Sequence, residues 1–378
     1  MWRSYHRAID GVVHPDFERV AAVFRSQLRR TTGGAALAVY HHGELVVDCW
    51  GGRRDDELDW ERDTLAMCFS TTKGVTSTAL HVLADRGRID YDERVATYWP
   101  EFAQSGKARV TVRQLLSHAA GLHRIRSIVD RADRMLDWSY MVDALAGAEP
   151  AYQPGTANGY HALTYGWLVG ELVRRISGLD LAEFVQRELA EPVGVEGLYV
   201  GCPADQRHRV APLVRMGHLT LGPRPLRRFQ KETGARLGRL ASLVGSPVNP
   251  RRMINALAPR GIEDVLWDTE VMDASIPAAN GFFDARSLAR MYGAIAGAGP
   301  DTAGSVDGVR LLSPDTVDAM GRIQTWRRDL VLVMPMRWRM GYHLVGTTRG
   351  VLDTAFGHFG FGGSGGWATR CISLWATM

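Results

Sequence analysis

The order of the hydrophobic patterns along this chain constrains its fold more than any other feature. Two strand-like runs, 35–40 and 44–50, are joined by a short polar connection and predict a β-hairpin. Helical spacing dominates the middle of the chain, and two further strand-like segments, 330–334 and 338–345, follow near its end. Strands, then helices, then strands again indicate an α/β domain that is interrupted by a helical insertion.

The length of the chain, 378 residues, suits about two structural regions. We expect residues 1–85 and 275–378 to form a discontinuous α/β domain and residues 86–274 to form a mainly helical domain, with the active site in the cleft between them. The expected helices span five segments, namely residues 16–29, 72–86, 110–118, 163–177 and 282–296.

The charge balance argues against a nucleic acid partner. The formal net charge is +4, from 45 Lys and Arg against 41 Asp and Glu, and the basic residues do not gather into one strongly basic domain. An Arg-rich stretch with several Pro and Gly lies at 221–252. We expect it to be a solvated, mobile surface, and a lid or a membrane-surface contact is the alternative.

The ends and the cysteines of the chain carry few signals. Residues 1–17 contain no apolar run of the length that a signal peptide or a membrane span needs, which predicts a cytoplasmic protein without stable membrane insertion. Cys49, Cys68, Cys202 and Cys371 are far apart and form no CxxC pattern. They predict ordinary thiols in place of a disulfide framework or a zinc site, and we expect neither a metal nor another cofactor.

Lysine is rare in this chain. It occurs only at positions 73, 107 and 231, so 42 of the 45 basic residues are Arg. Because Lys can deprotonate in a protein and Arg cannot, a Lys in such a background is a candidate for proton chemistry. Lys107 follows a polar Ser-Gly pair and Lys231 lies among arginines, so we expect both at the surface. Lys73 is therefore the candidate.

Ser70 stands three residues before Lys73, at the start of the helix expected over 72–86. This spacing places the two side chains on one face of a helix, about one turn apart. A serine hydroxyl needs a neighbouring base to attack a carbonyl, and an amine whose pKa is lowered by burial can serve as one. Free N–H groups at a helix start also suit a developing oxyanion.

The segment around this pair, FSTTKGVTSTALHVLADRGRIDYDERVATYWPEF, and the following VTVRQLLSHAAGL look like the catalytic helix region of a known superfamily. The chain resembles the serine β-lactamase-like proteins of the class C β-lactamase and D-Ala-D-Ala-peptidase type, and in particular their esterase branch, the family VIII carboxylesterases. A second motif that begins with Tyr matches Tyr160-His161-Ala162, and a third, Lys- or His-x-Gly, matches His358-Phe359-Gly360. The resemblance covers about residues 15–367.

The resemblance implies a β-lactamase/transpeptidase-like fold, in which helices flank an antiparallel sheet, and a set of roles. Ser70 would be the acyl-accepting nucleophile, Lys73 its base or proton relay, and Tyr160 a partner in the proton transfer if nearby cations hold its pKa below the usual value. The backbone N–H groups of Ser70 and Phe361 would form the oxyanion hole, with His358 on the same wall.

Two departures from the β-lactamase motifs bear on the substrate. Ala162 replaces an Asn that binds the amide side chain of a β-lactam, and His358 replaces a Lys that meets its carboxylate. Both changes weaken recognition of an anionic amide, so we expect a small neutral carboxylic ester as substrate. A β-lactamase or D-Ala-D-Ala carboxypeptidase is the second interpretation, and a non-catalytic relative that binds a peptide or a lipid is the third.

Two other residues imitate catalytic groups. Ser364 lies in a Gly-rich GxSxG pattern, but no His follows it, so a Ser-His-Asp arrangement of the α/β-hydrolase kind is not expected there. His118 lies next to Ser117 at the end of an apolar helical run, which favours a structural role for the imidazole.

The last residues depart from the resemblance. After Trp367-Ala368 the family continues with a core strand and a terminal helix, whereas this chain ends in TRCISLWATM. We expect a truncated or frame-shifted end, or a variant without those elements. Either would expose a sheet edge and a sheet face beside His358, which would lower stability or favour a homodimer.

Overall fold

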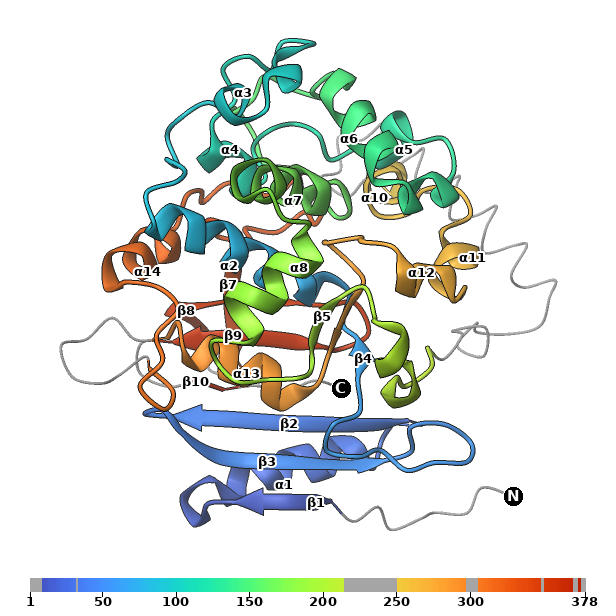
Figure 1. Cartoon of the computed structure of the whole chain (residues 1–378), viewed down its shortest axis with the longest axis vertical. Coiled ribbons are helices and arrows are strands. Elements are labelled where there is room, and N and C mark those ends of the chain that lie inside the picture. Colours follow the sequence, from blue (N-terminus) through green and yellow to red (C-terminus); the bar gives the residue numbers. More distant parts are fainter. Residues whose placement is uncertain are drawn as a thin grey trace.

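The computed structural model describes residues 9–31, 33–213, 250–296, 305–347, 350–369 and 373–374. Its main element is a seven-stranded sheet with the strand order β1-β3-β2-β10-β9-β8-β7, in which every neighbouring pair is antiparallel. In Figure 1 this sheet fills the lower half of the molecule, and the helices from the middle of the sequence lie above it. The structure thus confirms the predicted mixture of an antiparallel sheet and helices.

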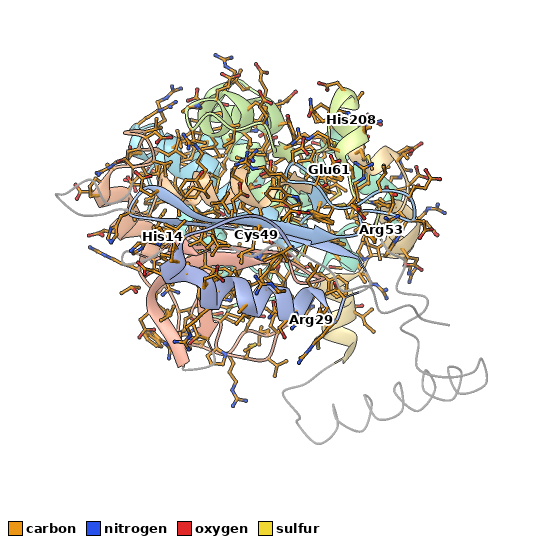
Figure 2. The ribbon with its side chains drawn as sticks, turned by 90° about the horizontal axis from the view of Figure 1, so that it is seen from below. His14, Arg29, Cys49, Arg53, Glu61 and His208 are labelled. Carbon is orange, nitrogen blue, oxygen red and sulfur yellow. The ribbon has the colours of Figure 1, made fainter. Side chains whose placement is uncertain are left out.

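The predicted hairpin consists of β2 (Gly34–His41) and β3 (Glu44–Gly52), with β1 (Asp10–Val13) on its outer edge. Side chains alternate between the two faces of a strand, and in β2 both sets are buried because each face packs against its own apolar cluster. Leu37 and Val39 contact helix α1 (Glu18–Leu28), whereas Ala38 and Tyr40 belong to the main core. Figure 2 shows α1 beneath the hairpin, with Arg29 at its end and Cys49 on β3.

The other half of the sheet comes from the end of the chain. It consists of β7 (His343–Thr347), β8 (Gly350–Phe359), β9 (Gly365–Thr369) and β10 (Ser373–Leu374). The expectation of an exposed sheet edge beside His358 is wrong, because β8, which carries His358, pairs with β7 and β9, and Ser373 and Leu374 continue the sheet from β9 to β2. The last described strand therefore joins the two halves of the sheet.

The predicted strand at 330–334 is also wrong, because those residues form turns. The segment 338–345 becomes a strand only from His343 onward. The helix expected over 282–296 begins later, since Gly281–Phe283 is the central strand β6 of a small second sheet with β4 (Ala66–Met67) and β5 (Leu198–Val200). Helix α13 follows as Ala285–Gly293, capped at its start by Asp284.

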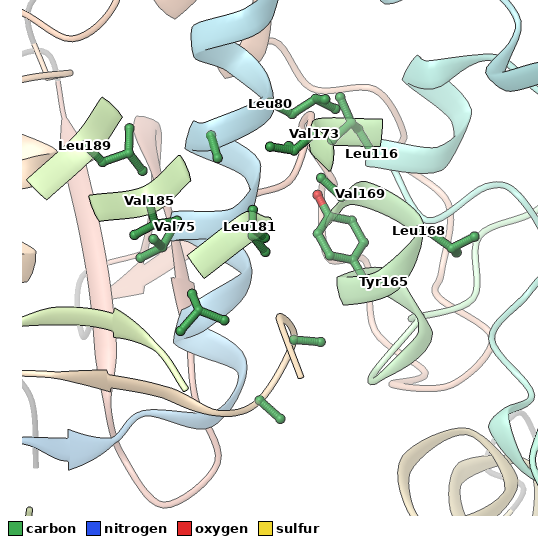
Figure 3. Close-up of a cluster of buried hydrophobic side chains, with 14 of the residues drawn as sticks. Val75, Leu80, Leu116, Tyr165, Leu168, Val169, Val173, Leu181, Val185 and Leu189 are labelled. Atoms are coloured by element: carbon green, nitrogen blue, oxygen red, sulfur yellow. The ribbon is translucent and has the colours of Figure 1, made fainter. Parts of the chain in front are cut away.

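Helix α2 (Thr72–Asp85) lies inside the molecule, and every residue from Thr72 to Leu83 is buried. It packs against α7 (Thr164–Ser177) and α8 (Leu181–Val185), whose apolar side chains lie on opposite sides of it in Figure 3. Tyr165 of α7 also shares a 2.7 Å hydrogen bond with the hydroxyl of Ser77 on α2. Such complete burial fixes the position of the first turn of α2, and Ser70 lies just before that turn.

The other α-helices among the described residues are mostly short, and most of them come from the middle of the chain. They are α3 (Val95–Tyr98), α4 (Val112–Leu116), α5 (Ile125–Ile128), α6 (Trp138–Gly147), α10 (Pro250–Leu257), α11 (Ile262–Leu266), α12 (Glu270–Asp273) and, beside the sheet, α14 (Pro314–Gly321). Across the described ranges, no helix combines the length and the apolar character that crossing a membrane requires. The predicted domain boundaries at 85 and 275 stay predictions.

The expectation of a surface position for Lys107 is also wrong, because its side chain is buried. Its ammonium donates hydrogen bonds to three backbone carbonyls, those of Gln104, Ala146 and Ala148. Two of these carbonyls lie at the end of α6, where a cation is favourable. Of the cysteines, Cys49, Cys68 and Cys202 are free and buried. Lys231, Cys371 and most of the Arg-rich stretch, residues 221–249, lie outside the described residues.

Candidate active site

Ser70 lies in a tight turn, Phe69–Thr71, that leads directly into α2. The residue before it, Phe69, has a φ of 43°, in the left-handed region that a bulky side chain rarely adopts. The turn holds this conformation because Thr72 donates to the Phe69 carbonyl at 2.5 Å and receives the backbone N–H of Gly281 at 2.8 Å. Backbone strain of this kind gathers at functional sites.

Two side chains meet at the hydroxyl of Ser70. Lys73 Nζ lies 2.9 Å from Ser70 Oγ, and the hydroxyl of Tyr160 donates to the same oxygen at 2.7 Å. Lys73 Nζ also lies 5.0 Å from the centre of the Tyr160 ring. The structure therefore brings together the three residues that the sequence singled out, although Tyr160 is 90 residues away along the chain.

Lys73 is fully buried, and its other hydrogen bond goes to the carbonyl of Ala278 at 2.9 Å. Burial lowers the pKa of this amine well below its ordinary value, because the charged form loses its hydration. Burial thus favours the neutral amine, which can accept a proton.

The expectation for Tyr160 is wrong in one respect. Burial raises the pKa of its phenol well above the ordinary value, and this effect outweighs the opposing hydrogen bond with Ser70. The neighbouring histidines do not supply the required cations, because burial lowers the pKa of His118, His161 and His358 well below the usual value. Tyr160 is thus a neutral hydrogen-bond donor in this structure, and Lys73 is the better base.

The turn that holds Ser70 is hydrogen-bonded to Ser364, the residue before strand β9. Thr71 shares a 3.2 Å hydrogen bond with Ser364, and Ser364 donates to the carbonyl of Cys68 at 2.8 Å. Ser364 is buried and hydrogen-bonded to the turn, so it supports the turn and is not positioned as a nucleophile. The same close packing requires glycine at position 360, since a Cβ there would lie 2.2 Å from both the Cys68 carbonyl and the Ser364 hydroxyl.

His358 lies on β8, with its ring centre 6.2 Å from that of Tyr160. Its Nδ1 lies 2.9 Å from the Phe359 carbonyl and must carry the proton there, while Nε2 is buried and has no protein partner among the described residues. Phe361, next to the third motif, is exposed, and its ring meets that of Phe69 edge-on at 5.7 Å. His358 therefore lies next to Tyr160, and Phe361 lies next to the turn that holds Ser70, while their roles stay predictions.

The neighbours of Tyr160 in the second motif point in different directions. Ala162 is buried in an apolar cluster with Tyr160 and Trp338. His161 is buried, and its Nε2 accepts the backbone N–H of Leu122 at 2.9 Å. His118, as predicted, is a packed core residue, and its Nδ1 accepts the backbone N–H of His161 at 3.1 Å.

Two residues beside Tyr160 were missed by the sequence analysis. Trp338 is fully buried and stacks on the phenol ring, with the ring centres 5.5 Å apart and an angle of 10° between the planes. Asp329 is a buried carboxylate that accepts the backbone N–H of Tyr160 at 3.2 Å. The apolar run 330–334 after Asp329 indicated a strand, so nothing in the pattern pointed to an acid that folds back on its own turn.

A sheet of this topology, with a buried helix that begins at the serine, is the β-lactamase/transpeptidase-like fold. Solved structures with this fold include a family VIII carboxylesterase, with a TM-score of 0.83 and 35% identity over 98% of this chain and 93% of the other. A penicillin-binding protein homolog from Caulobacter crescentus matches with a TM-score of 0.80 and 34% identity, over 98% of this chain and 93% of that one.

The sequence itself matches the Beta-lactamase family over residues 20–378, and the chain belongs to that family. Among curated proteins it is similar to the esterase/beta-lactamase LipL of Mycobacterium tuberculosis, with 40% identity over 369 residues, which is 96% of this chain and 80% of LipL. Esterase EstB of Burkholderia gladioli is 31% identical over 196 residues, 47% of this chain and 50% of EstB.

Proposed function

We propose that this protein is a serine hydrolase that cleaves carboxylic esters through an acyl-enzyme on Ser70. The observation that carries the proposal is the arrangement at one oxygen, where a fully buried Lys73 amine and the Tyr160 hydroxyl both lie within hydrogen-bond distance of Ser70 Oγ. The matching protein names, esterase/beta-lactamase and family VIII carboxylesterase, support the same chemistry.

In the first half of the reaction, Ser70 Oγ attacks the ester carbonyl and its proton passes to the neutral amine of Lys73. The negative oxygen of the tetrahedral intermediate is held by the backbone N–H groups of Ser70 and Phe361. As the carbon–oxygen bond of the ester breaks, the neutral Tyr160 hydroxyl donates its proton to the leaving alcohol and takes one from Lys73 in the same step, so the phenol relays the proton without becoming charged. Water then attacks the acyl-enzyme by the same proton path and releases the acid.

The third motif favours a neutral ester over a β-lactam. His358 carries no positive charge, because its pKa is lowered by burial and its one proton is used on the Phe359 carbonyl. It therefore offers no cation to a substrate carboxylate. Ala162 offers no amide and lies in an apolar cluster. A neutral ester loses neither interaction.

Three assays test this function on the full chain. A fluorophosphonate should label the wild type covalently on Ser70, and p-nitrophenyl esters from acetate to palmitate should be cleaved faster than a chromogenic cephalosporin. Ser70→Ala should lose both labelling and hydrolysis by more than about 10³-fold. Ser364→Ala is the matched control and should keep the label.

The three interpretations give different results in these assays. Absence of any adduct on Ser70 would favour the non-catalytic relative that binds a peptide or lipid. Faster turnover of the cephalosporin than of every ester would favour the β-lactamase. The ester series also reports whether long acyl chains are accepted, as in a lipase. The cytoplasmic location and the homodimer stay predictions, which fractionation and light scattering can check.

A further inference from the structure

Asp329 is the centre of a buried network next to the candidate active site. Its Oδ1 accepts three backbone N–H groups, those of Tyr160 at 3.2 Å, Val331 at 2.8 Å and Leu332 at 2.9 Å. Its Oδ2 accepts the indole N–H of Trp338 at 3.0 Å. All four donors are uncharged, and they match the ionised carboxylate, whose two oxygens only accept, better than the acid form, which must donate its own proton. Burial raises the pKa of this carboxyl, and the four hydrogen bonds oppose that rise.

The same carboxylate holds Tyr160 in two ways. It binds the backbone of Tyr160 directly, and it binds the indole that stacks on the phenol ring at 5.5 Å. The carboxylate of Asp329 therefore fixes the main chain of Tyr160 directly and its ring through Trp338. The Tyr160 hydroxyl, at the far end of that ring, lies 2.7 Å from Ser70 Oγ.

The turn that follows Asp329 contains a strained residue, so this arrangement has an energetic cost. Val333 has a φ of 63°, a left-handed conformation that is unfavourable for a β-branched residue. The turn is closed by the backbone bonds from Val333 to Asp329 at 2.9 Å and from Asp329 to Met334 at 3.0 Å. It is also attached to the segment before Tyr160, since Leu330 donates to the Asn158 carbonyl at 2.8 Å.

The charge of Asp329 has a second effect on Tyr160. After burial, which is the larger cause, the nearby carboxylate raises the pKa of the phenol further. The phenol thus keeps its proton and stays a donor toward Ser70. An uncharged residue at position 329 would lack this effect and could not accept all four hydrogen bonds.

We propose that Asp329 is the positioning residue of Tyr160, and that it acts through Trp338 and the Tyr160 backbone to place the phenol hydroxyl on Ser70. This inference rests on the proposed function, in which Tyr160 relays the proton. A displacement of about 1 Å at a reacting group can cost on the order of 10²-fold in rate, so the loss of this support should be measurable.

A double-mutant cycle on the full chain tests the proposal with p-nitrophenyl butyrate as substrate. We expect Asp329→Asn to lower kcat by about 10- to 100-fold with KM changed by less than about 3-fold, because the substrate does not touch Asp329. Trp338→Phe keeps an aromatic ring but removes the indole donor, and should lower kcat by about 3- to 10-fold. In a Tyr160→Phe background each change should cost less than about 2-fold more, since no hydroxyl remains to be positioned.

The control is Asp353→Asn, which removes an exposed carboxylate that pairs with Arg337, a near neighbour of Trp338 in the sequence. It should leave kcat unchanged in both backgrounds. The proposal would be overturned if Asp329→Asn and Trp338→Phe cost as much in the Tyr160→Phe background as in the wild type. An unchanged kcat in Tyr160→Phe itself would overturn it too.

Two further measurements keep the outcome decisive. If Asp329→Asn does not fold, the Trp338→Phe cycle decides alone. Fluorophosphonate labelling of Ser70 distinguishes failure of this proposal from failure of the proposed function. A labelled wild type with an additive cycle refutes only the role of Asp329. An unlabelled wild type refutes the proposed function.

Discussion

Two buried lysines, Lys73 and Lys107, lie in very different surroundings. Both side chains are fully buried. Lys107 donates to three backbone carbonyls, and burial lowers its pKa only to about 8. Lys73 has one carbonyl, that of Ala278, and the hydroxyl of Ser70, and its pKa falls well below the ordinary value. Burial lowers the pKa of both amines and acts more strongly on Lys73, and the two amines also differ in their hydrogen-bond partners.

The comparison shows what makes a buried amine a base. Three carbonyl dipoles are acceptors that only an ammonium with three N–H bonds can satisfy, so the site of Lys107 retains the cation at neutral pH. One carbonyl and one hydroxyl leave Lys73 free to be neutral, because a hydroxyl can turn and donate to the amine. We therefore expect Lys107 to stabilise the fold and Lys73 to perform chemistry.

Replacement of Lys73 by Met should have the largest effect on activity. Without a base, ester hydrolysis should fall by about 10³-fold, which is the usual contribution of a general base. Lys73→Arg should lose as much, since a guanidinium does not deprotonate in a protein. The free energy of unfolding should change by less than about 1 kcal/mol, because a costly buried amine is removed along with its one carbonyl contact. The measurements are kcat/KM on p-nitrophenyl butyrate and urea unfolding, and substantial activity in either variant would contradict the role of Lys73.

Lys107→Met should give the opposite result. Three buried carbonyls lose their donor, so the free energy of unfolding should fall by about 3 kcal/mol. The remaining folded protein should keep its kcat, counted per site labelled by the fluorophosphonate. A loss of kcat per labelled site with unchanged unfolding would reverse the assignment of the two lysines.

The sequence predicted the centre of this site because its geometry is local. Ser70 and Lys73 face one another on one helical turn, and the order of strands and helices indicated the fold correctly. Tyr160 and His358 were placed only by resemblance, since no local rule brings them to Ser70. The burial of Lys107 could not be predicted, because the carbonyls of Ala146 and Ala148 come from a helix end about 40 residues away.

The segment 329–334 shows a second limit. Its apolar run is typical of a strand, but the side chain of Asp329 takes the N–H groups that a strand would pair with a neighbour. The pKa of Tyr160 was mispredicted for a related reason, since the depth of burial belongs to the packed structure and not to the motif. Long-range contacts and the depth of burial therefore could not be predicted from the sequence.

The pH dependence of acylation separates the two lysines further. Lys73 must be neutral to accept the Ser70 proton, so kcat/KM should rise about tenfold per pH unit below its pKa and level off above it. Because that pKa lies well below 10.5, the plateau should begin well before pH 10. The buried His118, His161, His343 and His358 near Lys73 stay neutral, since burial lowers the pKa of each. Lys107→Met should leave the curve in place, and a shifted curve would mean that Lys107 contributes to it.

The smallest effect concerns stability and the sign of its change with pH. The folded pKa of Lys107, about 8, lies below the ordinary value of 10.5, so between these values the unfolded chain binds more protons. Stability therefore increases with pH in this window, as the cost of burying the charge disappears. From about pH 7.5 to about pH 9.5 the wild type should gain on the order of 2 kcal/mol relative to Lys107→Met, measured by urea unfolding at each pH. A constant difference would show that the three carbonyls hold the ammonium at its ordinary pKa, which would widen the contrast with Lys73.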